Sequence, residues 1–269
     1  MQLNGRHGSG FRRAGLALLV CTSMLASPGV RADRMAVIER VKPSIVAVGT
    51  FDSTRTPPFQ FLGTGFAVGD GTTIVTNAHV VPTVLDPEGK EGLAILMRAP
   101  NNDARGQAQV VVKQAKAQKI DPTSDLALLK IEGLALPALK IAVSSGAKEG
   151  QEILFTGYPL GAVLGPYPST HHGMISSIAP IAIPQSHAGD LNPQTIRRIA
   201  AGAFPILQLD ATAYPGHSGS PVYDAETGEV LGIINMVFVK SAKESVLSQP
   251  SGITYAIPAS RLQDLLKAQ

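Results

Sequence analysis

The apolar residues of the chain fall into short runs rich in Val, Ile and Thr, separated by segments rich in Gly and Pro. Such runs are typical of β-strands, because branched side chains pack well on a pleated sheet. Twelve strands are predicted: Ile45–Phe51, Gly65–Val68, Thr73–Thr76, Ala94–Met97, Ala108–Val112, Leu126–Ile131, Ile153–Gly157, Gly173–Ile178, Ile206–Leu209, Ser220–Tyr223, Val230–Met236 and Ile253–Ile257. So many short strands indicate barrels or a sandwich.

Two helices are predicted, one before the strands and one after them. The first spans Met35–Val41 and is ended by Pro43. The second is capped by Ser260, and its apolar face consists of Leu262, Leu265 and Leu266. Neither helix lies between consecutive strands, as a parallel α/β sheet requires, so the predicted fold class is all-β with terminal helices.

A turn-rich segment, Glu132–Gly150, separates six of the predicted strands from the other six. We place the boundary between two domains within it. Residues 33–140 are then predicted to form an N-terminal β-barrel, and residues 141–269 a C-terminal β-barrel with the closing helix.

The first 32 residues resemble a secretory signal. Three arginines, Arg6, Arg12 and Arg13, precede the apolar run Ala14–Ala26, and Val30–Ala32 provides small residues for cleavage before Asp33. A membrane anchor is the alternative, but about 20 apolar residues are needed to cross a bilayer. We therefore predict a signal peptide over residues 1–32 and a mature protein that is periplasmic or secreted and not inserted in the membrane.

Loss of this segment changes the charge balance. The chain has 23 basic and 20 acidic residues, and four of the arginines lie within residues 1–32, which leaves 19 against 20. The nearly neutral remainder gives no reason to expect a nucleic-acid partner.

The only cysteine, Cys21, also lies within residues 1–32, so we expect no disulfide and no thiolate metal site in the mature protein. A lipoprotein anchor at Cys21 is disfavoured by Val20 before it.

The sequence Gly216-His217-Ser218-Gly219 is compatible with a serine nucleophile in a tight turn, although by itself such a motif in a glycine-rich chain is more often an ordinary turn. Chain order narrows the choice of base. An α/β-hydrolase needs a histidine after its serine, and His217 is the last histidine in the chain. The base must therefore come from upstream of Ser218.

His79 follows a predicted strand among small residues, and Asp125 ends a loop where a buried strand begins. A carboxylate at such a place can bind the imidazole and fix its tautomer. The alternative for His79 is a purely structural histidine. Other aspartates between His79 and Ser218 have Pro, Asn or Gly neighbours that suggest solvated turns: Asp86, Asp103, Asp121 and Asp190.

The order His, Asp, Ser on an all-β chain resembles that of trypsin-like proteases, and more narrowly the HtrA/DegP family. The motifs that carry the resemblance are Gly63-Thr64-Gly65-Phe66, Thr76-Asn77-Ala78-His79-Val80-Val81, Ser124-Asp125-Leu126-Ala127-Leu128-Leu129, Gly157-Tyr158-Pro159-Leu160-Gly161, Gly216-His217-Ser218-Gly219 and Gly252-Ile253-Thr254-Tyr255-Ala256-Ile257-Pro258. They extend over nearly the whole predicted mature chain.

The resemblance implies two six-stranded antiparallel barrels with the active site in the cleft between them. His79 would act as general base, Asp125 would orient it, and Ser218 would be the nucleophile. The backbone N–H groups of Gly216 and Ser218 would form the oxyanion hole. This mechanism requires no cofactor, and the partners it implies are polypeptide substrates.

Three departures from the family pattern stand out. Ser220 replaces a glycine, which would strain the backbone only if that residue were left-handed. His217 stands where the family often has Asn, and we expect it at the surface or in a subsite. The PDZ domain common in the family is also expected to be missing. Nothing in the sequence predicts the oligomeric state.

The specificity pocket is expected to be uncharged. The resemblance to trypsin-like proteases implies that it would include Thr212, Ile233, Ile234 and Asn235. A neutral, shallow pocket favours a small or medium aliphatic P1 side chain.

His171, His172 and His187 match no zinc motif, so no metal site is predicted.

The predicted function is serine endopeptidase activity on unfolded or damaged envelope proteins. One alternative is a latent or inactive module that keeps the protease fold and binds peptides in a chaperone-like way. A second is an esterase with the same triad, for which the sequence shows no acyl pocket.

Overall fold

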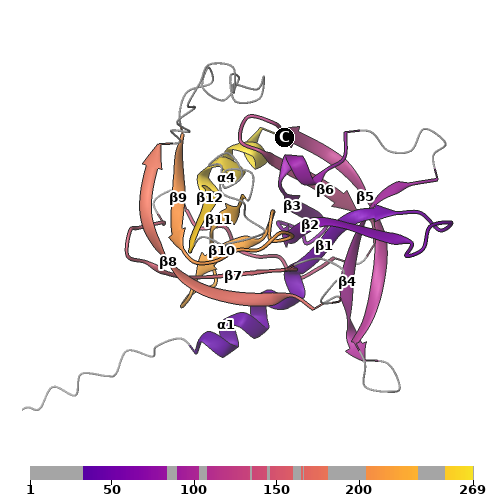
Figure 1. Cartoon of the computed structure of the whole chain (residues 1–269), viewed down its shortest axis with the longest axis horizontal. Helices are drawn as coiled ribbons and strands as arrows, with labels where there is room; N and C mark the ends of the chain where they lie inside the picture. Colours follow the sequence, from indigo (N-terminus) through magenta and orange to yellow (C-terminus); the bar gives the residue numbers. More distant parts are fainter. Residues whose placement is uncertain are drawn as a thin grey trace, which may run out of the picture. The chain divides into compact units, whose positions relative to one another are not determined.

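The computed structural model of the chain describes residues 33–83, 90–102, 108–133, 135–143, 146–159, 165, 167–180, 204–235 and 252–268. The described strands form two closed antiparallel barrels (Figure 1). The first contains β1 Ile45–Phe51, β2 Phe59–Val68, β3 Thr73–Thr76, β4 Gly92–Asn102, β5 Ala108–Asp121 and β6 Leu126–Ile131. The second contains β7 Glu152–Gly157, β8 Ser169–Pro180, β9 Pro205–Asp210, β10 Pro221–Asp224, β11 Val230–Ile234 and β12 Ile253–Pro258. The predicted fold class is confirmed.

Each barrel closes in the same way. The neighbouring strands run β1-β2-β3-β6-β5-β4 around the first barrel and β10-β11-β12-β9-β8-β7 around the second. Because the barrels are closed, each described strand pairs with a neighbour on both sides, and closure brings the ends of β2, β3 and β6 together on one side of the first barrel.

Several strands are longer than predicted. β2 begins at Phe59 rather than Gly65 because its first residues pair with the end of β1, as in the pairing of Phe51 with Phe59. β5 continues to Asp121 although its second half is polar. It pairs with β4 and β6 while many of its side chains face solvent, so its apolar residues are too few to mark its length.

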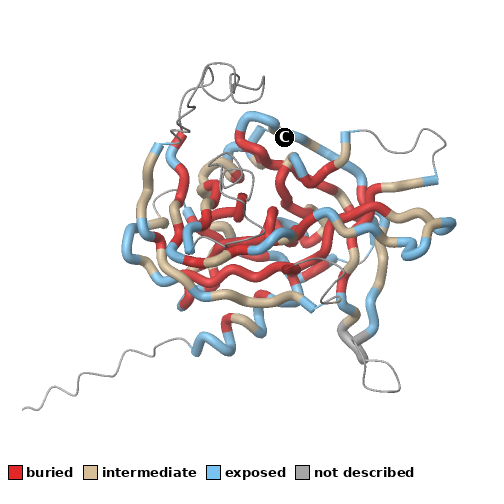
Figure 2. The backbone as a smooth tube through the Cα atoms, in the orientation of Figure 1, coloured by how far each residue is buried: buried red, intermediate tan, exposed pale blue. Residues whose placement is uncertain are grey.

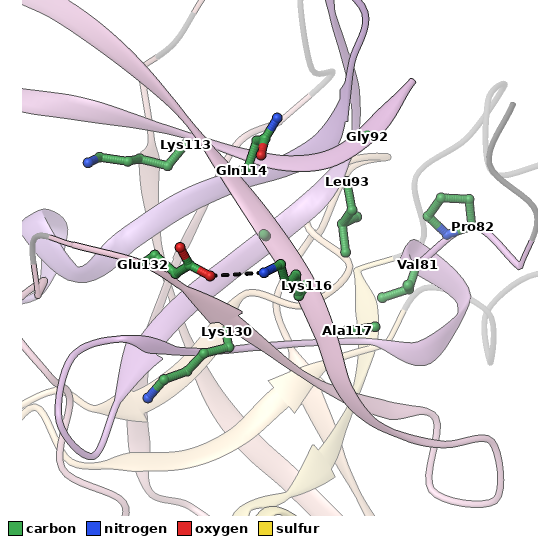
Figure 3. Close-up of a pocket in the computed structure, with 11 residues that line it drawn as sticks. Val81, Pro82, Gly92, Leu93, Lys113, Gln114, Lys116, Ala117, Lys130 and Glu132 are labelled. Atoms are coloured by element: carbon green, nitrogen blue, oxygen red, sulfur yellow. Dashed lines mark hydrogen bonds and ion pairs between the residues drawn. The ribbon is translucent and has the colours of Figure 1, made fainter. Parts of the chain in front are cut away.

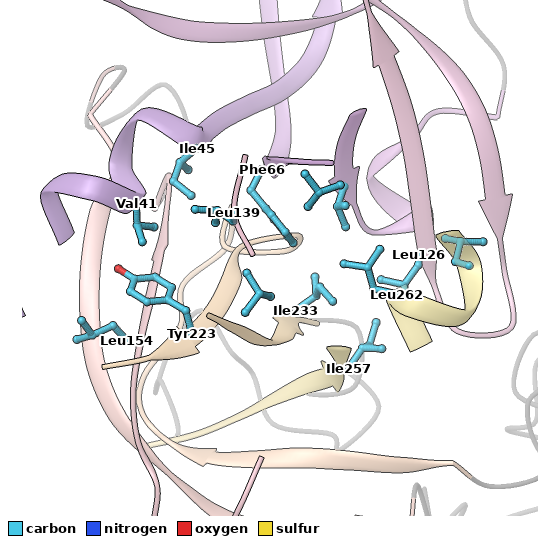
Figure 4. Close-up of a cluster of buried hydrophobic side chains, with 14 of the residues drawn as sticks. Val41, Ile45, Phe66, Leu126, Leu139, Leu154, Tyr223, Ile233, Ile257 and Leu262 are labelled. Carbon is cyan, nitrogen blue, oxygen red and sulfur yellow. The ribbon is translucent and has the colours of Figure 1, made fainter. Parts of the chain in front are cut away.

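A hydrophobic cluster joins the two barrels. Each barrel also has an apolar core of its own, and Figure 2 shows the buried residues concentrated along the strands. The shared cluster contains Phe66 from β2 and Ile233 from β11, both fully buried, and helix residues Val41 and Leu262 (Figure 4). Burial of such side chains contributes roughly 1.5 to 3 kcal/mol each, so the barrels support one another's position.

The terminal helices lie close to the predicted ranges. α1 spans Arg34–Val41, is capped by the Asp33 side chain, and is followed by the 3-10 turn η1, Lys42–Ser44. α4 spans Ala259–Lys267. The prediction that Ser260 caps this helix is wrong, because β12 runs directly into the helix and extended Pro258 takes the cap position without a side-chain hydrogen bond.

The connection from β6 to β7 contacts one barrel and then the other. Leu139 makes a parallel bridge with Val68 of β2, and Ile141 makes one with Val230 of β11. The predicted boundary between residues 140 and 141 falls between these contacts. The predicted signal peptide lies outside the described residues, and no helix in the described part of the chain is long and apolar enough to span a membrane.

Candidate active site

His79 lies on a single 3-10 turn that directly follows β3. β3 ends at Thr76, Asn77 is fully buried, and η2, Ala78–Val80, carries the histidine. The Ala78 N–H donates to the Asp125 carbonyl at 3.1 Å, and Asn77 Nδ2 donates to the same oxygen at 3.1 Å. The backbone around His79 is thus tied to the backbone of Asp125 before the two side chains meet.

Asp125 is placed by an unusual backbone conformation just before β6. Its φ of 55° lies in the left-handed region, and it is the only described residue other than glycine with a positive φ. Aspartate tolerates this region better than most residues. The conformation turns the side chain inward, where only 1% of the residue is exposed.

The two side chains form a close and directional pair. His79 Nδ1 lies 2.7 Å from Asp125 Oδ2, and the His79 backbone N–H donates to Asp125 Oδ1 at 2.9 Å. Only 1% of the Asp125 side chain is exposed, against 28% of the His79 side chain. A carboxylate at this position favours the tautomer with the proton on Nδ1, which leaves Nε2 as the basic nitrogen.

Ser218 lies in a turn between β9 and β10, flanked by glycines with left-handed backbones. Gly216 has a φ of 104° and Gly219 a φ of 86°. A Cβ on Gly219 would lie 2.0 Å from the Thr64 carbonyl oxygen, so no other residue fits there. Ser220, which follows, has no positive φ, and its replacement of a glycine therefore costs no left-handed strain.

The N–H groups of Gly216 and Ser218 have no hydrogen-bond partner among the described residues. Their neighbours in the turn are bonded: the His217 N–H donates to the Tyr214 carbonyl at 3.0 Å and the Ser220 N–H to the His217 carbonyl at 2.9 Å. Two such N–H groups, one on the serine itself and one two residues before it, can bind the oxygen of a tetrahedral intermediate.

His217 is not at the surface, contrary to expectation. It is fully buried and packs edge-on against Phe155 and His171, with ring centroids 5.3 Å and 4.9 Å away. Tyr214 N–H donates to its Nδ1 at 3.0 Å, while its Nε2 has no partner among the residues that the structure describes. Burial of the ring is the main cause that lowers the pKa of His217 to about 4, and the nearby imidazole of His171 contributes to the same shift. The His217 ring is therefore an uncharged, buried part of the core next to the serine turn.

Contacts between the two barrels link the Ser218 turn to the barrel that carries His79, but they do not complete the hydrogen bonding of the triad among the described residues. The Thr64 N–H on β2 donates to the Ser218 carbonyl at 2.8 Å, which anchors the serine turn to the barrel that carries His79. Within the described residues, no hydrogen bond joins the Ser218 hydroxyl to the His79 ring. Catalytic hydrogen bonds often tighten only when substrate is bound.

Comparison with known proteins identifies the family. The sequence model of the trypsin-like peptidase domain matches residues 63–233, which include all three predicted triad residues. The chain belongs to the trypsin-like peptidase family. The predicted resemblance to HtrA/DegP proteins is confirmed by its relatives: a probable periplasmic serine endoprotease, DegP-like, of Ectopseudomonas mendocina is 29% identical over 78% of this chain and 36% of its own length.

A further sequence relative and two solved structures also resemble this chain. A probable periplasmic serine endoprotease, DegP-like, of Halomonas elongata is 26% identical over 94% of this chain and 54% of its own length. The chain thus spans about a third to a half of the length of these two relatives. The solved structures of the serine endoprotease from Yersinia pestis and of Deg5 have TM-scores of 0.59 and 0.57 at 23% identity. They cover 89% and 86% of this chain, which covers 67% and 90% of theirs, and they support the fold.

The residues expected to line the specificity pocket of this trypsin-like peptidase domain have different surroundings. Ile233 and Ile234 are fully buried in the hydrophobic cores, and Thr212 is half-buried. Asn235 is also fully buried, and its Nδ2 donates to Asp125 Oδ2 at 2.8 Å. Of the four side chains, Thr212 is the only one with appreciable exposure.

Asn235 is a site residue whose place the sequence reasoning missed. It supports the carboxylate of Asp125 from the second barrel, so that Asp125 accepts hydrogen bonds from His79 and Asn235 together. The available signal was a single polar residue directly after the fully apolar strand β11, a position where an unpaired amide would be costly.

A cavity of about 570 Å³ lies on the first barrel beyond the histidine turn (Figure 3). Val81 and Pro82 form one wall, and the Lys116–Glu132 ion pair, with an N–O distance of 2.9 Å, lies at the other. No triad residue lines it.

Of the histidines considered for a metal, His171 and His172 contact different partners. His171 stacks on Phe155, with ring centroids 5.0 Å apart, and His172 contacts Glu152. His187 lies outside the described residues. No group of three His, Cys, Asp or Glu side chains suited to a metal occurs in the part of the chain that the structure describes.

Proposed function

We propose that this protein is a serine endopeptidase that hydrolyses peptide bonds through an acyl-enzyme. The observation that carries the proposal is the buried pair of Asp125 and His79, with 2.7 Å between carboxylate and imidazole, on the barrel to which the Ser218 turn is bonded. Family membership and the DegP-like serine endoproteases among its relatives support the same reaction.

The proposed mechanism uses only groups of this chain. His79 Nε2 takes the Ser218 proton as Oγ attacks the peptide carbonyl carbon, and Asp125 stabilises the imidazolium. The carbonyl oxygen becomes negative and binds the N–H groups of Gly216 and Ser218. His79 then returns the proton to the leaving amine as the C–N bond breaks. A water molecule, deprotonated by His79, hydrolyses the acyl-enzyme and restores Ser218.

The proposed substrates are unfolded or damaged proteins of the cell envelope, cleaved after small or medium aliphatic residues. Thr212 is uncharged, and the side chains of Ile233 and Ile234 point into the cores, which supports a shallow neutral pocket. The periplasmic names of the relatives and the signal-like N-terminal sequence support export.

The direct test is labelling with a fluorophosphonate probe, with casein cleavage measured in parallel. The probe should attach to Ser218, and Ser218→Ala should abolish both labelling and cleavage. Ser220→Ala is a matched control, because Ser220 is a fully buried serine two residues away whose hydroxyl has no partner in the described part of the chain. Labelling that survives Ser218→Ala, or a folded protein that is neither labelled nor active, would refute the assignment.

A latent, peptide-binding state is the second candidate. The observation that favours it is that Ser218 Oγ and the His79 ring are not hydrogen-bonded within the described residues. The two candidates differ in their reaction with the fluorophosphonate probe. An active peptidase is labelled without added peptide, whereas a latent protease is labelled faster once a peptide is bound, and a pure binding module retains casein without cleaving it or reacting with the probe.

A further inference from the structure

Thr64 lies at the junction of the two barrels and has no role in the proposed chemistry. It is a fully buried residue of β2, between Gly63 and Gly65. The glycines around it allow close contact: a Cβ on Gly63 would come within 3.1 Å of the Ser218 carbonyl oxygen, and one on Gly157 within 2.9 Å of Thr64 Oγ1. The absence of side chains on these glycines therefore leaves room for the Thr64 hydroxyl between the neighbouring backbone segments.

Every polar atom of Thr64 is used. Its N–H donates to the Ser218 carbonyl at 2.8 Å, and its hydroxyl donates to the Gly216 carbonyl, also at 2.8 Å. The same hydroxyl accepts from the Tyr158 N–H at 3.0 Å, and the Thr64 carbonyl accepts from the Thr76 hydroxyl at 2.7 Å. Because the Tyr158 N–H occupies the acceptor side of the hydroxyl, the proton of Thr64 Oγ1 is directed at Gly216.

These bonds hold alternate peptide planes of the serine turn. The peptide between Gly216 and His217 is fixed on its carbonyl side by Thr64 and on its N–H side by the Tyr214 carbonyl, at 3.0 Å. The peptide between Ser218 and Gly219 is fixed by Thr64 and, at 3.1 Å, by the Ile234 carbonyl. Among the described residues, the N–H groups of this turn left without partners are those of Gly216 and Ser218, the proposed oxyanion hole.

We propose that Thr64 is a positioning residue that holds the Gly216–Ser218 turn with both oxyanion donors free and ties it to the barrel carrying His79. This role rests on the proposed function. The Thr64 hydroxyl does not touch the substrate. It fixes the two carbonyls behind the donors, so that little reorganisation is needed when negative charge develops on the substrate oxygen.

The test compares Thr64→Val, which keeps the shape but removes the hydroxyl, with Thr64→Ser, which keeps the hydroxyl. Thr156→Val is the matched control, because Thr156 is equally buried and its hydroxyl also makes two hydrogen bonds, with Thr170 and Tyr223, but none with the serine turn. For each protein, kcat and KM on a peptide substrate and the inhibition constant of a peptide boronate are measured. Amide hydrogen exchange of residues 214–220 is followed in parallel.

Thr64→Val should lower kcat about 10- to 100-fold with KM nearly unchanged, because the oxyanion hole is filled only in the transition state. Boronate binding should weaken by a similar factor. Exchange of the His217 and Gly219 amides should accelerate about tenfold or more as the turn loosens. Thr64→Ser should stay within about threefold of the parent in kcat, since it retains the hydroxyl.

Equal effects of Thr64→Val and Thr156→Val on kcat and boronate binding would overturn the proposal, as would a Thr64→Ser variant as impaired as Thr64→Val. If Thr64→Val does not fold, Thr64→Ala replaces it in the same comparison. If the unaltered protein neither cleaves nor reacts with a fluorophosphonate, the proposed peptidase function fails. Hydrogen exchange of the turn then decides the role of Thr64, and unchanged exchange in the hydroxyl-free variant refutes it.

Discussion

Acid should destabilise the folded protein through His217, well before the carboxylates are protonated. This residue is fully buried in the second barrel. Three neighbours surround its ring: Phe155 of β7, His171 of β8 and Tyr214 of its own turn. Burial and the imidazole of His171 lower the pKa of His217 to about 4, from 6.5 in the unfolded chain.

The direction of the effect follows from proton binding. Between pH 6.5 and 4 the unfolded chain binds a proton at His217 and the folded protein does not, so the free energy of unfolding falls as pH falls. At about 1.4 kcal/mol per pH unit, the loss between pH 6.5 and pH 5 is about 2 kcal/mol. Burial also lowers the pKa of His171, which adds to the loss in the same direction.

The assay is urea unfolding at pH 6.5 and pH 5.0 in a Ser218→Ala background, which prevents self-cleavage. His217→Asn keeps an acceptor near the Tyr214 N–H but cannot titrate. It should reduce the pH-dependent loss of unfolding free energy by about 2 kcal/mol. His172→Asn is the control, because His172 is an exposed histidine on the same sheet. An identical pH dependence with and without His217 would refute the reasoning.

Three further outcomes follow from the described contacts. Asp125→Asn should lower kcat about 10⁴-fold, because the imidazole loses its tautomer control, while the fold by circular dichroism stays unchanged; activity near the parent level would contradict the triad. Asn235→Ala should lower kcat about tenfold by removing one donor to Asp125, and Asn235→Asp, which has the same shape but no donor, should lower it more; steady-state kinetics with equal kcat in all three proteins would dismiss this support. Phe66→Ala, in the cluster shared by both barrels, should cost about 3 to 5 kcal/mol in urea unfolding, and a loss below 1 kcal/mol would show that the shared cluster does not stabilise the fold.

The sequence was most informative where a feature is local. Runs such as Leu126–Ile131 marked strands because each run is apolar and ends at a turn, and the observed β6 has the same bounds. It was less informative where the signal depends on a partner. The second half of β5 is a strand because β4 and β6 pair with it, and its polar residues face solvent. Ser260 could not be excluded as a cap until the direct passage from β12 into α4 was known.

The same division applies to the candidate site. The amino-acid sequence by itself determined the all-β class and the order of His79, Asp125 and Ser218, because strand patterns and chain order are written in neighbouring residues. Only the tertiary structure decided that His217 is buried, that Asn235 lies behind Asp125, and that Thr64 holds the serine turn. Thr64 and Gly216 are 152 positions apart. Contacts between such distant residues arise from barrel closure and packing, and no local pattern of hydrophobic and polar residues records them.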